Sequence, residues 1–305
     1  MTSPQPDLWI LVTLAAAAFQ TVRFMLQKVL ATSTLSAAGA TFSRFIYSAP
    51  FIALLLVLYL RVTDAAIPAL SVRFWGFGLL GAATQILATV CVVALFKQRN
   101  FAVGITFKKT EVIQTVLVGF VLLGEAVSWQ GFGAIALGLI GLLLLSGDED
   151  ARGFSLRDLS KPAAVLGIAS GILFAFSAVS YRGASLTLAT EDPLLRAGVT
   201  LAAVVGMQTA LMVVWLRLRQ PGEIARVWAA RRVALWIGLT SMGGSLCWFI
   251  AFTLQNAAYV KALGQVELIL SVLAATLFFR ERITAREALG MAVLVASIVL
   301  LILVI

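Results

Sequence analysis

The sequence predicts an all-α integral membrane protein whose ten transmembrane helices form two inverted five-helix repeats around a central cavity. Composition is the first reason: the 305 residues are 61% hydrophobic and only 12% charged, whereas soluble globular domains have about 25% charged residues. The second reason is a repeat of uncommon residue types. Cys91, Asn100, Glu111 and Glu125 each have an identical residue 156 positions further along the chain. The chain is therefore expected to contain two copies of one membrane-spanning unit.

Ten apolar segments fall into two groups of five, separated by residues 147–161, the most charged stretch of the chain. A helix needs about 20 apolar residues to cross a bilayer. Because five is odd, the second group must cross the membrane in the opposite sense, as in the inverted repeats of many transporters. We expect a first repeat at residues 1–147, a polar linker at 148–161 and a second repeat at 162–305. The predicted spans are Leu8–Gln27, Ala37–Leu60, Phe74–Phe96, Phe101–Gly124, Trp129–Ser146, Ala163–Ser185, Leu194–Leu216, Val233–Leu254, Ala257–Phe279 and Glu287–Ile305.

Basic residues predict how the spans are oriented. Most of the Lys and Arg outside the spans lie in connections that follow odd-numbered spans, for example Arg217, Arg219, Arg231 and Arg232. Basic connections remain in the cytoplasm, so both termini are expected outside it. Contact with anionic lipid explains the formal net charge of +9, and no nucleic-acid partner is expected. No Lys or Arg precedes the first span, so it is expected to be retained and not removed as a secretory signal.

The fourth and ninth spans contain ionisable residues. Lys108, Lys109 and Glu111 lie inside the fourth span, and one charged residue at the centre of a helix costs about 2.5–3.5 kcal/mol on insertion scales. These residues are therefore expected to face a polar interior. Lys108 precedes Glu111 by one helical turn and can neutralise it. Glu267 has Gly264 at the equivalent place, so its partner must come from another helix, a ligand or a proton.

Three basic residues, Arg44, Arg196 and Lys261, lie near the starts of spans. Long basic side chains in such places commonly extend to the membrane surface, and we expect this of Arg44 and Arg196. Lys261 is also a candidate, with Lys108 and Lys109, for binding a carboxylate or another anionic group of a substrate.

Other polar and aromatic residues within the spans predict a site for a small molecule. Gln20, Gln85, Tyr181 and Trp248 supply the mixture of aromatic walls and few hydrogen-bonding groups that small-molecule sites have. Each of them can also serve helix packing or anchoring at the membrane interface. We expect the four side chains to line a central cavity.

The residue inventory excludes several classes of function. The chain has no histidine, and the acids within spans are Glu111 and Glu267, so neither a metal site nor a hydrolytic triad is expected. The absence of a GxxxxGK[ST] motif argues against ATP as the energy source. We therefore expect no cofactor and no enzymatic activity. The two glutamates are candidates for contacting a substrate amine or for coupling transport to protons.

The pattern resembles a known family. Two five-helix units, an RF pair in the second span and the segments LLGEAVSWQGFGAIALGLIGLLLL and FFRERITAREALGMAVLVASIVLLIL resemble the EamA-type members of the drug/metabolite transporter superfamily, over nearly the whole chain. The resemblance implies a ten-helix inverted repeat, a central cavity and alternating access without ATP in a bacterial inner membrane. Family members include exporters of amino acids, among them aromatic amino acids. Many relatives are thought to have cytoplasmic termini, which conflicts with the orientation expected from the basic loops.

The sequence thus predicts a secondary transporter that exports small amphipathic metabolites, with amino acids as the favoured class. Three alternatives stay open: an uncoupled facilitator of the same solutes, an integral membrane enzyme acting on lipid, and a non-transporting scaffold. The lack of histidine and of aspartate within the spans argues against the enzyme. The charges within the spans argue against the scaffold, which has no need of them.

Overall fold

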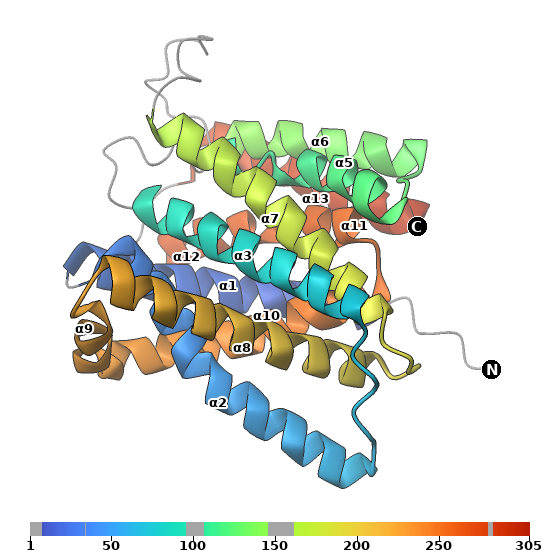
Figure 1. Ribbon diagram of the computed structural model, residues 1–305. Helices are drawn as coiled ribbons and strands as arrows, with labels where there is room; N and C mark the ends of the chain where they lie inside the picture. The colour runs from blue at the N-terminus through green and yellow to red at the C-terminus, as the bar shows by residue number, and fades with distance from the viewer. Residues whose placement is uncertain (1–7, 34, 96–106, 146–161, 280–282) are drawn as a thin grey trace.

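The computed structural model describes residues 8–33, 35–95, 107–145, 162–279 and 283–305, and all regular secondary structure in these residues is α-helical. Seven of the described helices are long and apolar enough to cross a membrane. Figure 1 shows α5, α6 and α13 on one side of the bundle, α2, α8 and α10 on the other, and α1, α3 and α7 between them. The helices are α1 (Leu8–Ser33), α2 (Ala37–Thr63), α3 (Val72–Leu95), α5 (Glu111–Leu123), α6 (Trp129–Leu145), α7 (Pro162–Leu186), α8 (Pro193–Arg219), α9 (Glu223–Ala229), α10 (Arg231–Leu254), α11 (Ala257–Leu263), α12 (Val266–Phe279) and α13 (Ala285–Val304).

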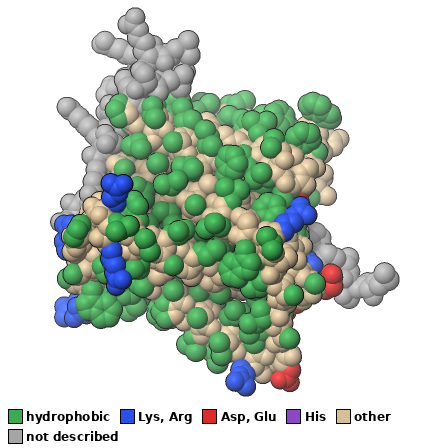
Figure 2. Space-filling model, in the orientation of Figure 1, with side chains coloured by type: hydrophobic (Ala, Val, Ile, Leu, Met, Phe, Trp, Pro, Cys, Tyr) green, Lys and Arg blue, Asp and Glu red, His purple; other side chains and the backbone are tan. Residues whose placement is uncertain are grey.

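The surface agrees with a membrane environment. Figure 2 shows hydrophobic side chains over most of the visible flank, with Lys and Arg side chains near its ends. Large apolar residues such as Leu117, Phe120 and Val121 are well exposed on α5, which is the arrangement expected where a helix faces lipid tails. The fold is that of a multi-pass membrane protein.

Side-chain caps explain where four helices begin. Ser36 and Asp192 accept hydrogen bonds from backbone N–H groups in the first turns of α2 and α8. Ser128 does the same for α6, and Thr284 forms a reciprocal capping box with Glu287 on α13. Each cap satisfies backbone N–H groups that the helix itself leaves without partners. The polar residue before each of these helices therefore sets its first turn.

The fourth and ninth predicted spans are not continuous helices, which corrects the sequence prediction. In the fourth span a turn at residues 109 and 110 precedes α5, which begins at Glu111. In the ninth span Gly264 and Gln265 separate α11 from α12. Glu111 and Glu267 therefore lie in the first turns of helices. A carboxylate is favoured there by the backbone N–H groups at a helix N-terminus, which a continuous helix would not offer.

Some predicted features lie outside the described residues: Asn100, the first part of the fourth span and the whole polar linker at 148–161. The basic connection between the seventh and eighth predicted spans contains the short helix α9. Its Glu223 is fully buried, and Glu223 Oε1 accepts a hydrogen bond of 2.6 Å from the Ser36 backbone N–H. This contact ties α9 to the start of α2.

The seam between α6 and α13 is closely packed. A Cβ atom built on Gly141 would lie 2.7 Å from Leu294 N, and one built on Gly290 would lie 2.9 Å from Gly141 O. Ser297 Oγ donates a hydrogen bond of 2.7 Å to the carbonyl oxygen of Ala134 across the same seam. Small residues of this kind let helix backbones approach closely in lipid, so the seam holds the two halves of the chain together.

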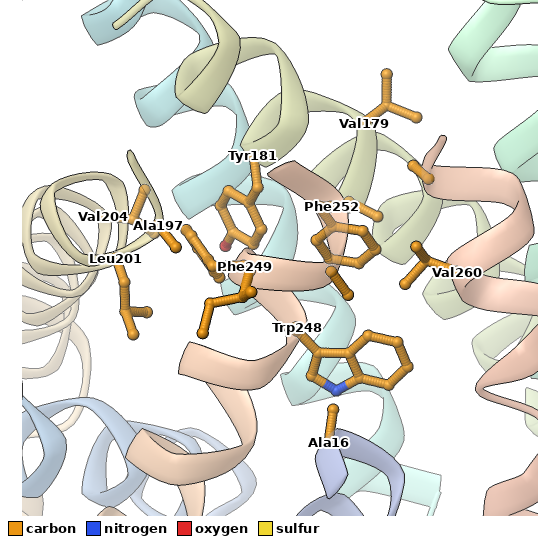
Figure 3. Close-up of a cluster of buried hydrophobic side chains, with 14 of the residues drawn as sticks. Ala16, Val179, Tyr181, Ala197, Leu201, Val204, Trp248, Phe249, Phe252 and Val260 are labelled. Atoms are coloured by element: carbon orange, nitrogen blue, oxygen red, sulfur yellow. The ribbon is translucent and has the colours of Figure 1, made fainter. Parts of the chain in front are cut away.

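The largest apolar core lies among α1, α7, α8, α10 and α11 and forms one wall of the central region (Figure 3). The rings of Tyr181 and Phe249 stack with centroids 4.4 Å apart, and those of Trp248 and Phe252 stack at 5.6 Å. Such offset aromatic pairs fix ring positions more strictly than aliphatic packing does. The core therefore presents ordered aromatic faces toward the breaks in the fourth and ninth spans.

Candidate functional site

Five ionisable side chains meet at the two helix breaks: Lys108, Lys109, Glu111, Lys261 and Glu267, which we call the charged layer. Lys108 Nζ lies 3.5 Å from Glu111 Oε2, and Lys261 Nζ lies 3.6 Å from Glu111 Oε1. Lys109 Nζ lies 3.7 Å from Glu267 Oε2. None of the five residues is more than 9% exposed. Each acid is therefore paired, inside the protein, with a lysine from the opposite half of the chain.

Helix α1 contributes polar groups to this layer. Gln20 Nε2 donates a hydrogen bond of 2.5 Å to Glu267 Oε2, and Arg23 Nη2 lies 3.4 Å from Gln20 Oε1. Arg23 is buried, and its Nη1 has no hydrogen-bond partner among the described residues. The partner that Glu267 lacks on its own helix is thus supplied by other helices, which is one of the three possibilities left open by the sequence.

Arg44 does not extend to the membrane surface, and that prediction is wrong. Only 8% of Arg44 is exposed. Its Nε donates to Ser241 Oγ at 2.8 Å, its Nη2 to Ser245 Oγ at 3.2 Å, and its Nη1 to Thr89 Oγ1 at 3.3 Å. Hydroxyl groups on α3 and α10 therefore replace water around the guanidinium. Ser241 and Ser245, one helical turn apart in the eighth span, were the sequence signal for such a partner.

Arg196 and Arg182 form ion pairs away from the charged layer, as does Arg226 with Glu223 in α9. Arg196 Nη2, at the start of α8, lies 3.8 Å from the exposed Glu191, and its side chain is 20% exposed. Arg182 Nε lies 2.7 Å from Glu125 Oε1, and its Nη1 donates to the carbonyl oxygen of Phe252 at 2.7 Å. Arg182 thus joins the turn after α5 to the end of α10. Glu125, which follows the fourth predicted span, therefore serves to hold helices together.

A cavity of about 30 Å³ adjoins the charged layer, and five residues predicted for the site line it. This volume accommodates water molecules only, so the cavity is too small for an amino acid. The other members of the charged layer do not line the cavity: Lys108, Lys109, Glu111 and Glu267. The predicted residues that line the cavity are Gln20, Gln85, Tyr181, Trp248 and Lys261, and the lining residues not selected from the sequence are Arg44, Phe174, Ser177, Ala178, Ser245, Phe249 and Phe252.

Aromatic rings surround the cationic groups beside the cavity. Lys261 Nζ lies 5.1 Å from the ring centroid of Trp248 and 5.5 Å from that of Phe174. Lys108 Nζ lies 5.1 Å from the centroid of the same Phe174 ring. Attraction between a cation and a ring face is strongest where water is excluded. Phe174 therefore helps to hold both ammonium groups, a role that the sequence alone did not indicate.

Two of the predicted lining residues also bind neighbouring helices. Tyr181 Oη donates to the carbonyl oxygen of Gly81 and accepts from Gln208 Nε2, each at 3.0 Å. Gln85 Oε1 accepts a hydrogen bond of 2.7 Å from Ser177 Oγ. Both the packing role and the lining role considered for these residues are therefore present in the geometry. Figure 3 shows the Tyr181 ring beside Phe249, with Trp248 on the side of α1.

Comparison with known proteins finds a family similarity in the second half of the chain. Residues 161–303 match the sequence model of the EamA-like transporter family. A solved structure described only as "Crystal structure of protein" superposes with a TM-score of 0.64 and 16% identity, over 95% of this chain and 99% of that chain. At this identity the likeness shows the fold alone. No curated protein sequence matches the chain. Residues 161–303, just under half of the chain, are thus similar to the EamA-like transporter family.

Proposed function

We propose that this protein is a secondary transporter that exports small amphipathic metabolites by alternating access, and that amino acids are the first class to test. The observation that supports this most strongly is the meeting of two broken helices at one charged layer beside an aromatic cavity. Broken helices near the membrane midplane are where secondary transporters bind substrates and coupling ions. A cavity with room only for water molecules implies that its walls must separate to admit a solute.

Helix starts support the proposal of two repeats, at residues 1–147 and 162–305. The capping residues Ser36 and Asp192 stand 156 positions apart, and so do the capping residues Ser128 and Thr284. The acids at the two breaks, Glu111 and Glu267, have the same offset. Three structural features at one offset are what duplication of a five-span unit produces.

Helix packing supports an inverted relation between the repeats. Exchanging the halves pairs α1 with α7, α2 with α8, α3 with α10, α5 with α12 and α6 with α13. The contact of α3 with α7 then corresponds to that of α1 with α10, and the contact of α5 with α7 to that of α1 with α12. The contacts α2 with α8 and α6 with α13 correspond to themselves. This pattern is expected of a two-fold axis that relates the two halves. With the five spans proposed for each half, that axis lies in the membrane plane, and one repeat can rock against the other around it.

The same proposal assigns roles to the predicted site residues. Lys261 with Lys108 and Lys109 would attract a carboxylate, and Gln20, Gln85, Tyr181 and Trp248 would contact the rest of the solute. Glu111 and Glu267 would couple transport by exchanging their lysine partners for a proton or a substrate amine. Their burial supports such a role because removing water makes each change of charge energetically large.

Flux measurements in proteoliposomes test the transport proposal. Labelled amino acids would be loaded with and without a pH gradient, and protein-free liposomes would serve as the control. Saturable flux that rises with the gradient is expected for a proton-coupled carrier, and saturable flux indifferent to it would indicate an uncoupled facilitator. No saturable flux of any amphipathic solute would contradict the proposal.

The orientation is proposed from the basic loops, with both termini outside the cytoplasm of a bacterial inner membrane. Single cysteines introduced at Arg226 and Arg61 would lie at opposite ends of the bundle, and the natural Cys91 and Cys247 would be replaced by serine in both variants. A membrane-impermeant thiol reagent applied to whole cells should label the cysteine at position 61 and spare the one at 226. The reverse pattern would overturn this orientation.

A further inference from the structure

A surplus of positive charge surrounds the central cavity. Among the described residues, the charged layer contains three lysines and two glutamates, and Arg23 and Arg44 are buried beside it. Five buried cations against two buried acids leave a formal surplus of three positive charges. Such a surplus within a membrane is unfavourable unless an anion compensates it.

Among the described residues, the two arginines form no close ion pair, although Glu267 attracts Arg23 from a greater distance. Arg44 donates to three hydroxyl groups, which carry no charge. Arg23 donates to the side-chain oxygen of Gln20, and its Nη1 is buried with no hydrogen-bond partner in the described part of the chain. Hydrogen bonds from neutral groups satisfy donors, but they do not neutralise a buried guanidinium.

Two of the cationic groups line the cavity itself. Arg44 comes from α2 and Lys261 from α11, so they approach the cavity from opposite halves of the chain. The wall beside them includes the rings of Phe174, Trp248 and Phe252. A ligand that fits this wall has an anionic group between two cations and an apolar body against the rings. Guanidinium groups bind carboxylate and phosphate oxygens in matching pairs.

The two acids do not offer an equivalent place for a cation. Glu111 lies within 3.6 Å of two lysine ammonium groups, and Glu267 is engaged by Lys109 and Gln20. A solute amine would have to displace these partners, whereas a solute carboxylate would find Arg44 without an acid beside it.

We propose that the cavity selects organic anions, meaning solutes with an apolar or aromatic body and more negative than positive charge. This inference rests on the proposed transport function and narrows its substrate class from amphipathic metabolites, including zwitterionic amino acids, to acidic ones. Arg44 and Lys261 hold the anionic group, and Arg23 raises the positive potential behind it.

Binding to the purified full-length protein tests this with four ligands that share a phenyl body and differ in charge. Phenethylamine is a cation, phenylalanine a zwitterion, 3-phenylpropionate a monoanion and benzylmalonate a dianion. Calorimetric titration should give an affinity that rises along this series, with benzylmalonate at least about tenfold tighter than phenylalanine. Phenyl phosphate added to the series distinguishes phosphate from paired carboxylates, and tighter binding of either one supports the proposal.

Substitutions test which residues cause the preference for anionic ligands. Arg44→Gln and Lys261→Gln should each reduce the preference for benzylmalonate over phenylalanine several-fold. Arg44→Lys keeps the charge and should keep most of the preference, which guards against a folding failure of the glutamine variant. Arg61→Gln removes an exposed charge at the end of α2 and should leave the preference unchanged.

The outcomes separate the two proposals. Phenylalanine or phenethylamine binding as tightly as benzylmalonate would overturn the selection of anions, and so would failure of all four ligands to bind. Saturable flux of zwitterions without any preference for anions would overturn it too, while leaving the transport proposal intact. Tight binding of anions without flux would instead support the anion site and contradict transport.

Discussion

The breaks before α5 and α12 place an acid at equivalent positions but neutralise it differently. Glu111 is held by Lys108, one turn before it, and by Lys261 from the other half of the chain. Glu267 is held by Lys109 from the other half and by the neutral side chain of Gln20. The two halves thus share the position of the acid and differ in the source of the cations. Glu111 has two lysine ammonium groups within 3.6 Å, whereas the close partners of Glu267 include one ammonium group and one amide, with Lys108 and Arg23 attracting it from further away.

Removing the acid at the first break should have the largest effect. Glu111→Gln leaves Lys108 and Lys261 buried without their carboxylate, and removal of one partner from a buried ion pair typically costs about 3–5 kcal/mol. Thermal unfolding in detergent should show a large fall in Tm. The matched control is Glu191→Gln, which removes a fully exposed carboxylate and should leave the Tm nearly unchanged. Equal Tm values for the two variants would mean that the charged layer does not stabilise the fold.

Removing the acid at the second break should affect transport more than folding. In Glu267→Gln the amide can still bond to Gln20, and Lys109 is the lysine of the charged layer that loses its carboxylate, so we expect a stability loss of about 1–3 kcal/mol. Flux in proteoliposomes should fall by at least about tenfold, equivalent to roughly 1.4 kcal/mol. Normal flux by this variant would show that Glu267 has no part in coupling.

A double-mutant cycle measures how strongly the two halves are coupled. Lys109→Gln and Glu267→Gln should each destabilise the protein, and the double variant should lose less than the sum of the two. We expect a coupling energy of about 1–2 kcal/mol, within the range for residues in contact. The cycle requires the free energy of unfolding of all four proteins under one condition. A coupling energy of zero would show that Lys109 and Glu267 do not stabilise the contact between the two halves.

Breaking the ion pair between Glu125 and Arg182, which lies outside the charged layer, should have the smallest effect of these changes. Glu125 and Arg182 are 22% and 14% exposed, and partly exposed pairs contribute about 1 kcal/mol or less. Glu125→Gln should therefore lower the stability slightly, because Arg182 keeps its bond to the carbonyl oxygen of Phe252. Flux should be close to that of the unchanged protein. A loss of stability as large as that of Glu111→Gln would mean that this turn, and not the charged layer, holds the halves together.

Much of the helical architecture follows from the sequence because lipid imposes a strict length and composition on each span. Span boundaries such as those at Leu8, Ala37 and Trp129 agree with the observed helix starts. The breaks at Gly264 and before Glu111 did not follow. They lie where charged residues from distant parts of the chain meet, and the surrounding sequence is apolar enough to suggest an uninterrupted helix.

In the candidate site, too, the sequence predicts some contacts and not others. The sequence identified Lys108 and Glu111 as partners because they are one turn apart. It could not identify Lys261 as the second partner, since a separation of 150 residues has no periodic signature. Arg44 was misjudged for a related reason: its place near a span end is visible in the sequence, but the hydroxyl groups of Ser241 and Ser245 approach it only after α2 and α10 pack.

The crossed pairing of acids and lysines also constrains how the protein is made. The first half is synthesised before Lys261 and Glu267 exist, so Lys109 and half of the compensation of Glu111 lack their partners while it enters the bilayer. A newly made first half therefore carries unpaired charge within the membrane, which is energetically unfavourable. We expect residues 1–147 expressed alone to be degraded rapidly in a pulse-chase experiment and to be rescued when residues 148–305 are supplied as a second chain. Each half then becomes stable in the membrane only when the charges of the charged layer pair with those of the other half.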